Sequence, residues 1–225
     1  MKPLILLLVL LAPSASPARL FYHGNAGKRQ IALTFDAGAD RGYAGAILST
    51  LERLHLHATF GMTGRWARAN PDLVRRMARD KDEFINHTYD HRSFTGVSTQ
   101  SGPLTRAQRI WEIEQADRAI RSLTGHSSKP YFRPPYGDLD AGTLTLVRSL
   151  GYRDVVMWTV DTLGWEHLSA PQIVRRSLTL AVPGAIFLMH VGSQSQDSVA
   201  LPRVIELLKK RGYRFVTISL LLGHH

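Results

Sequence analysis

Two histidines four residues apart form the first candidate centre of chemistry. They are the first and last residues of the segment His87-Thr88-Tyr89-Asp90-His91, which follows an apolar stretch. If this segment forms a helical turn, both imidazoles lie on one side and can bind the same metal ion. Two unrelated surface histidines are the alternative interpretation. The chain contains no cysteine, so any metal site must use His, Asp or Glu side chains.

Four further residues could take part in the same chemistry. Asp36 ends an apolar run and could act as a base or a metal ligand, or could form a turn before Gly38. Asp40 follows a few residues later and could face the same site. Arg133 precedes two prolines and could hold a carboxylate through two hydrogen bonds, or belong to a structural turn. His190 is a lone imidazole, which on its own is more often a core residue than a catalyst.

Alternating apolar runs and helical patterns must position these side chains. We expect strands over 30–36, 58–63, 83–86, 131–133, 154–160, 185–190 and 214–218. Helical patterns lie between them, over 43–54, 71–80, 105–123, 141–150, 170–180 and 198–210. Strands that alternate with helices predict parallel pairing with right-handed crossovers. The expected fold class is therefore α/β, as a barrel or a doubly wound sheet.

Five of the polar residues stand at the carboxyl ends of expected strands, namely Asp36, His87, Arg133, Asp161 and His190. The carboxyl ends of parallel strands meet on one face of a barrel, where enzymes of such folds place their active sites. One polar strand end can arise by chance, but five form a pattern. The sequence therefore predicts an enzyme.

The motifs resemble the polysaccharide deacetylase family, which is the NodB-homology domain of carbohydrate esterase type. The likeness covers residues 28–218 and follows the family order. The matching segments are Thr34-Phe35-Asp36-Ala37-Gly38, His87-Thr88-Tyr89-Asp90-His91, Arg133-Pro134-Pro135-Tyr136-Gly137, part of Asp161-Thr162-Leu163-Gly164-Trp165, and Leu188-Met189-His190. The resemblance implies a distorted (β/α) barrel that removes N-acetyl groups from a β-1,4-linked amino-sugar polymer, such as peptidoglycan or chitin-type glycan.

The resemblance also implies a divalent metal, most often zinc, with cobalt or manganese as alternatives. His87 and His91 would bind it, and Asp36 would be the general base acting on water. Where the family usually has a metal-binding Asp, this chain has Ala37. Because a catalytic zinc site typically has three protein ligands, Asp36 itself or Asp40 could supply the third.

The remaining roles follow from the same resemblance. Arg133 would orient the base, and His190 would be the general acid toward the leaving amine. Where the family has an Asp that tunes this acid, the chain has Gly164, and Asp161 or Glu166 could replace it. The substrate would contact the Tyr136 backbone at the oxyanion, with Trp165 and Leu188 lining the acetyl pocket.

Length and composition bound the remaining expectations. The 225 residues suffice for one domain, which we place at 19–225. Residues 1–18 have a positive start, a short aliphatic run and small residues, which predict a secretory signal peptide. We therefore expect a secreted or envelope-associated monomer with no membrane span. The net charge of +10 favours anionic partners such as wall polymers, but the chain has no compact basic run typical of nucleic-acid binding.

Three other functions compete with the deacetylase. Ala37 and Gly164 favour a degenerate protein that only binds glycan. A metal-dependent hydrolase of a different amide would use the same residues. A basic nucleic-acid binder has the least support, because no basic and aromatic residues interleave.

Overall fold

The computed structural model describes residues 16–224. Residues 1–15 of the predicted signal peptide lie outside this part. The strands within it are β1 (Arg19–Phe21), β2 (Gln30–Ala37), β3 (Thr59–Met62), β4 (Glu83–Asn86), β5 (Tyr131–Phe132), β6 (Asp154–Val156), β7 (Val160–Asp161), β8 (Ile186–His190) and β9 (Arg214–Val216). The helices are α1 (Ala44–Arg53), α2 (Gly64–Ala69), α3 (Pro71–Arg79), α4 (Arg106–Thr124), α5 (Ala141–Ser149), α6 (Ala170–Leu180), α7 (Asp197–Lys210) and α8 (Ile218–Leu222).

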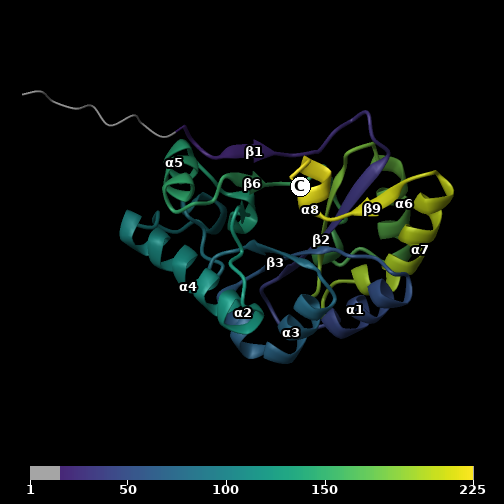
Figure 1. Ribbon diagram of the computed structural model, residues 1–225, viewed down its shortest axis with the longest axis horizontal. Helices are drawn as coiled ribbons and strands as arrows, with labels where there is room; N and C mark the ends of the chain where they lie inside the picture. Colours follow the sequence, from purple (N-terminus) through teal and green to yellow (C-terminus); the bar gives the residue numbers. More distant parts are fainter. Residues whose placement is uncertain (1–15, 225) are drawn as a thin grey trace, which may run out of the picture.

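The strands form one parallel sheet in the order β1-β6-β5-β4-β3-β2-β8-β7, and β9 pairs with the start of β2. β2 is the central strand, because it pairs with β3, β8 and β9. Its residues from Ile31 to Ala37 are buried, as expected where a parallel sheet is covered on both faces. In Figure 1, α4, α2, α3, α1 and α7 form an arc along one side of the strands, while β1 and α8 lie on the other.

The connection between β6 and β7 shows that the sheet curls. These strands lie near opposite ends of the sheet order, yet only residues 157–159 join them. Three residues span about 10 Å when extended, so the two ends of the sheet must come together. Met157 N–H donates to the β1 residue Phe21, and Thr159 N–H donates to the β8 residue Ile186. The result is the distorted α/β barrel that the sequence predicts.

Two expectations about the elements were wrong, and three short elements were not expected. The strand expected over 154–160 is two strands, because the chain leaves β1 and β5 after Val156 and joins β8 at Val160. The strand expected over 214–218 ends at Val216, since Ile218 already begins α8. The strand β1 and the short helices α2 and α8 were not expected. Each of these three has at most six residues, which is too few for a periodic pattern.

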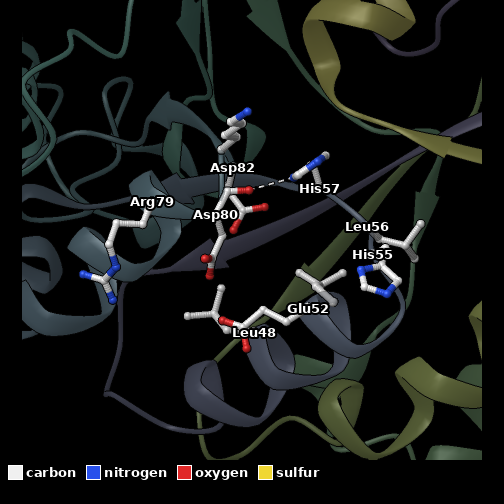
Figure 2. Close-up of a pocket in the computed structure, with 10 residues that line it drawn as sticks. Leu48, Glu52, His55, Leu56, His57, Arg79, Asp80 and Asp82 are labelled. Carbon is white, nitrogen blue, oxygen red and sulfur yellow. Dashed lines mark hydrogen bonds between the residues drawn. The ribbon is translucent and has the colours of Figure 1, made fainter.

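The amino-terminal edge of the sheet carries a hollow of its own. Figure 2 shows it between the loops that lead into β3 and β4, with Glu52, Asp80, Asp82 and two histidines, His55 and His57, around it. Its volume is about 370 Å³. It lies at the opposite ends of the strands from Asp36 and His87, so it is separate from the candidate site.

The part of the chain that the structure describes contains no helix long and apolar enough to cross a membrane.

Candidate active site

A buried ion pair lies at the centre of the site. Arg133, which follows β5, donates from Nη1 to Asp36 Oδ1 at 2.7 Å. The other guanidinium nitrogens donate to the Val156 and Met157 carbonyl oxygens at 2.9 and 3.3 Å. Burial alone would raise the pKa of Asp36, but the positive charge of Arg133, together with His87 and His190, holds that pKa below its usual range. Asp36 is therefore ionised at neutral pH and fixed in orientation.

Gly61 on the neighbouring strand β3 makes room for this pair. The register places Gly61 directly beside Asp36. A Cβ atom at position 61 would overlap Asp36 Oδ1 and lie 3.3 Å from its Cγ. The absence of a side chain here lets the carboxylate occupy the position that Arg133 requires.

The two histidines of the second motif meet, but not through the helical turn that the sequence suggested. Residues 87–91 form an irregular loop in which Thr88 and His91 have φ values of 65° and 60°. This left-handed conformation is costly for a β-branched residue such as Thr88. It brings the Nε2 atoms of His87 and His91 within 3.1 Å of each other. Asp36 Oδ2 lies 3.4 Å from His87 Nε2.

The hydrogen bonds of His87 define which of its nitrogens is available. Its Nδ1 lies 2.9 Å from the Arg133 carbonyl oxygen. Because a carbonyl only accepts, Nδ1 carries the proton and Nε2 keeps its lone pair. Burial lowers the pKa of both imidazoles, and that of His91 falls to about 3. Both are neutral at pH 7, which is the form that binds a metal ion.

The other predicted metal ligands do not join these imidazoles. Ala37 packs in the hydrophobic core and offers no donor. The Asp40 carboxylate instead accepts hydrogen bonds from the backbone N–H and hydroxyl of Ser193, which lower its pKa. Among residues 16–224, no three His, Asp or Glu side chains converge closely enough to hold a metal ion. The histidine pair with Asp36 beside it is the nearest approach to such a site.

His190 ends β8 opposite this pair, in register with Asp36 on β2. Its backbone N–H donates to Asp197 Oδ2 at 2.8 Å. Neither residue suggested as a substitute for the missing acid at position 164 makes a hydrogen bond with His190. Asp161 accepts from Leu163 N–H and from the Trp165 indole, and Glu166 is exposed. The carboxylate that contacts His190 is instead Asp197, which lies in none of the sequence motifs.

A cleft of about 500 Å³ connects these groups. Asp36, His87, His91 and His190 line it, together with the predicted substrate contacts Tyr136, Trp165 and Leu188. The Tyr136 ring packs edge-on against His91, with centroids 4.6 Å apart, and about half of the residue is exposed. Asp40 also lines the rim. The structure thus brings all nine predicted site residues to one cleft region, with Arg133 buried directly behind Asp36.

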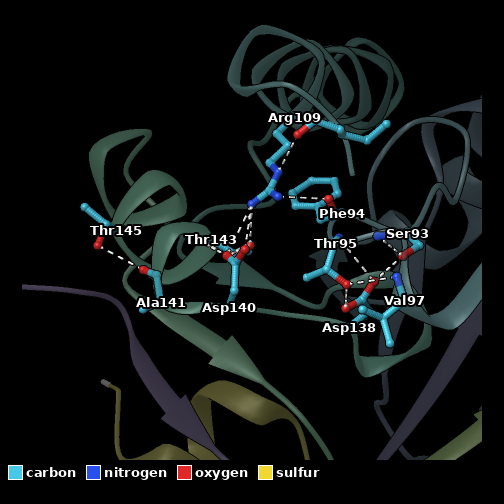
Figure 3. Close-up of polar contacts among 12 residues, drawn as sticks. Ser93, Phe94, Thr95, Val97, Arg109, Asp138, Asp140, Ala141, Thr143 and Thr145 are labelled. Atoms are coloured by element: carbon cyan, nitrogen blue, oxygen red, sulfur yellow. Dashed lines mark hydrogen bonds and ion pairs between the residues drawn. The ribbon is translucent and has the colours of Figure 1, made fainter. Parts of the chain in front are cut away.

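Two polar networks hold the loops at one side of the cleft. Figure 3 shows the Asp138 carboxylate accepting from the hydroxyl groups of Ser93 and Thr95. This ties the loop after His91 to the loop that carries Tyr136. In the second network, Arg109 of α4 donates to the Phe94 carbonyl oxygen and the Asp140 carboxylate. These contacts link α4, the loop after His91 and the start of α5.

The site has the features of a hydrolase active site in an α/β barrel. It combines a buried ion pair, two neighbouring imidazoles and a cleft at the carboxyl ends of parallel strands. The polysaccharide deacetylase family model matches residues 23–155, which is more than half of the chain. The chain belongs to this family. The match ends before Asp161 and His190, so the placement of these two residues rests on the structure.

Three bacterial proteins of this family are similar to the chain in sequence or in structure. A peptidoglycan-N-acetylglucosamine deacetylase from Bacillus cereus is 34% identical over 88% of this chain and 70% of its own length. The structure of PdaA from Bacillus subtilis, a family 4 carbohydrate esterase, is 30% identical with a TM-score of 0.82, covering 91% of this chain and 85% of that one. A family 4 pseudoenzyme from Bacillus anthracis has a TM-score of 0.83 at 28% identity, covering 93% and 70%.

Proposed function

We propose that this protein is a metal-dependent deacetylase that removes N-acetyl groups from the amino sugars of peptidoglycan. The observation that carries the proposal is the arrangement around Asp36. An ionised, buried carboxylate is fixed by Arg133 beside the Nε2 atoms of His87 and His91, and His190 faces it from the next strand. The deacetylase names of the similar bacterial proteins support peptidoglycan as the substrate class. Chitin-type oligosaccharides carry the same N-acetyl group and are the natural alternative.

The reaction divides between the two sides of the cleft. Asp36 accepts a proton from water as the water oxygen forms a bond to the acetyl carbonyl carbon. The His190 imidazolium donates a proton to the amide nitrogen, the C–N bond breaks, and the products are the free amine and acetic acid, which loses its proton to solvent as acetate. Without this second proton the amine is a poor leaving group. Each such proton transfer contributes roughly 10²–10⁴-fold to the rate.

The histidine pair fits a divalent cation. Two neutral imidazoles present nitrogen atoms 3.1 Å apart toward one point, and nitrogen donors of this kind suit zinc, with cobalt or manganese as alternatives. A cation bound there would polarise the acetyl carbonyl and make water more acidic. Asp36, rather than Asp40, would be the third ligand, because Asp36 Oδ2 lies 3.4 Å from His87 Nε2 while the Asp40 carboxylate is hydrogen-bonded to Ser193.

The aromatic residues of the cleft suit a sugar chain. Trp165 and Tyr136 are each about half exposed and line the cleft, so they offer flat apolar faces to a sugar ring. The buried Leu188 lies deeper in the same cleft and can contact the acetyl methyl group. The signal peptide and the envelope location belong to the same proposal, because peptidoglycan lies outside the cytoplasm.

The test measures acetate release by the purified protein from peptidoglycan and from N-acetylated chitooligosaccharides. Each substrate is assayed with the protein as prepared, after chelation, and after addition of zinc, cobalt or manganese. The proposal expects release that chelation abolishes and one of the metals restores. Release that survives complete removal of metal would refute metal dependence.

A glycan-binding pseudoenzyme is the second candidate, and Ala37 favours it. The Bacillus anthracis pseudoenzyme shows that this family includes inactive members, and a mutant of that protein has restored activity. The retained Asp36–Arg133 pair argues for activity, since glycan binding alone requires no buried base. Glycan binding without acetate release under any of the metals would establish the pseudoenzyme.

A further inference from the structure

Asp197, at the first position of α7, is fully buried beside His190. Its Oδ2 atom accepts from the His190 backbone N–H and from the Ser195 hydroxyl, both at 2.8 Å. Its Oδ1 atom is buried without a hydrogen-bond partner. Buried carboxylate oxygens are rarely left in this state, because the loss of solvation is costly.

The His190 imidazole has the complementary deficiency. Its Nδ1 atom is also buried without a partner. An imidazole that carries a proton on Nδ1 is a donor at that atom, and its Nε2 is then the atom that can gain and release a second proton. One residue therefore lacks an acceptor and its direct neighbour lacks a donor.

Gly164 provides the space in which Asp197 lies. A Cβ atom at position 164 would overlap Ser195 Oγ and lie 2.7 Å from Asp197 Oδ2. The carboxylate thus reaches the vicinity of His190 from α7, through the volume that a side chain on the loop after β7 would fill. Any residue other than glycine at this position would displace Ser195 and Asp197.

Resting on the proposed deacetylase function, we propose that Asp197 is the positioning residue for His190, accepting a hydrogen bond from Nδ1–H so that Nε2 faces the cleft. This contact would fix the ring orientation and keep one proton on Nδ1, so that in the imidazolium form the second proton, on Nε2, is the one given to the leaving amine. The other charged or titratable groups near His190 are Asp36, His87 and His91, across the cleft. Burial raises the pKa of Asp197, and a hydrogen bond from Nδ1–H would satisfy its remaining oxygen.

The decisive measurement is the tautomer of His190, read by nitrogen-15 NMR of the ring in the substrate-free protein. The proposal expects a protonated, hydrogen-bonded Nδ1 in the wild type. A ring protonated only at Nε2, with a free Nδ1, would overturn it without any variant. Because no substrate is present, this result does not depend on whether the protein releases acetate. A failure of the His190 proposal can therefore be told apart from a failure of the proposed deacetylase function.

Two substitutions should disturb the ring in the same way. Asp197→Asn removes the carboxylate, and Gly164→Ala displaces it without removing any polar group. We expect both to reduce the Nδ1–H population and to lower kcat for acetate release by about 10- to 100-fold, with a much smaller change in KM. Asp82→Asn, which changes a buried carboxylate at the other edge of the sheet, is the matched control, and neither the His190 signals nor kcat should change in it. Folded variants that retain the wild-type ring signals and kcat would overturn the proposal.

Discussion

The two edges of the sheet carry similar side chains in different environments. At the carboxyl edge, Asp36 and Arg133 are buried and bonded to each other, and the imidazoles of His87 and His91 meet. At the amino edge, the hollow in Figure 2 also gathers carboxylates and histidines. There the histidines are exposed, and His57 Nδ1 contacts only a backbone carbonyl oxygen. A cluster of titratable residues alone therefore does not identify an active site.

The carboxylates differ in the same way. Glu52 accepts from Arg76 at 2.6 Å on the surface, where such pairs contribute little to stability. Asp82 is buried with a single neutral donor, the Ala58 N–H at 2.8 Å, and burial raises its pKa to about 7. At Asp36, the positive charge of Arg133 counteracts burial and keeps the pKa of the carboxyl group low. The comparison predicts that substitutions at the carboxyl edge change activity, while those at the amino edge change stability.

Asp36→Asn should give the largest effect. The amide keeps the size of the side chain but cannot accept the proton from water, so acetate release should fall by roughly 10²–10⁴-fold. The measurement is kcat/KM for acetate release, with circular dichroism to show that the fold is retained. Asp82→Asn, the same change at the other edge, is the control and should leave kcat/KM unaltered. Equal activity of the Asp36 variant and the wild type would remove Asp36 as the base.

Asp82→Asn should instead alter the pH dependence of stability. The folded-state pKa of about 7 exceeds the unfolded value near 3.8, so between these pH values the folded protein binds more protons than the unfolded chain. The free energy of unfolding of the wild type should therefore decrease as the pH rises from about 4 to 7, by a few kcal/mol at about 1.4 kcal/mol per pKa unit.

Asparagine cannot lose that proton and can still accept from Ala58 N–H. The variant should therefore be more stable than the wild type above pH 7, and its stability should be nearly constant across the window. Urea unfolding at pH 4.5 and pH 8 measures both quantities. Identical slopes for the two proteins would show that Asp82 does not titrate in this range.

Gly61→Ala tests how tightly the carboxyl edge is built. The added methyl group would overlap Asp36 Oδ1, so either the ion pair or strand β3 must move. We expect a loss of about 1–3 kcal/mol in the free energy of unfolding, as for overpacking of a core, together with a loss of kcat. Gly45→Ala on α1 is the matched control, because a Cβ there meets nothing within 4 Å. Wild-type kcat in the Gly61 variant would mean that the Asp36 position is not critical.

The sequence predicted the carboxyl edge well because its signals are local. Asp36, His87 and His190 each end or directly follow a short apolar strand, and parallel strands bring such ends together. The site contacts that escaped prediction depend on distant packing. Asp197 lies seven residues beyond His190, and its position depends on how α7 packs against the loop of Gly164. Local patterns carry no signal for such a contact.

The loop of residues 87–91 shows a second kind of limit. Spacing alone correctly predicted that the two imidazoles meet, but suggested a helical turn as the cause. The actual cause is the left-handed backbone at Thr88 and His91, which the residue types disfavour. Hydrogen bonds from outside the local sequence stabilise it, such as that from Gly64 N–H to the Thr88 carbonyl oxygen at 3.0 Å. Backbone strain of this kind is imposed by tertiary structure, so the secondary-structure propensities of the residues do not predict it.

Trp165→Ala should give the smallest effect. It separates sugar binding from proton transfer among the residues of the carboxyl edge. The indole lines the cleft and is held by the Asp161 carboxylate, so its loss should weaken sugar binding and leave proton transfer intact. We expect KM to rise roughly 2- to 10-fold, equivalent to the 0.5–1.5 kcal/mol typical of one aromatic contact, with kcat nearly constant. Trp111→Ala is the matched control, because Trp111 is equally exposed, 47% against 48%, but does not line the cleft. Equal KM values for the two variants would show that the substrate does not contact Trp165, and an increase confined to the Trp165 variant would place a sugar ring against that indole.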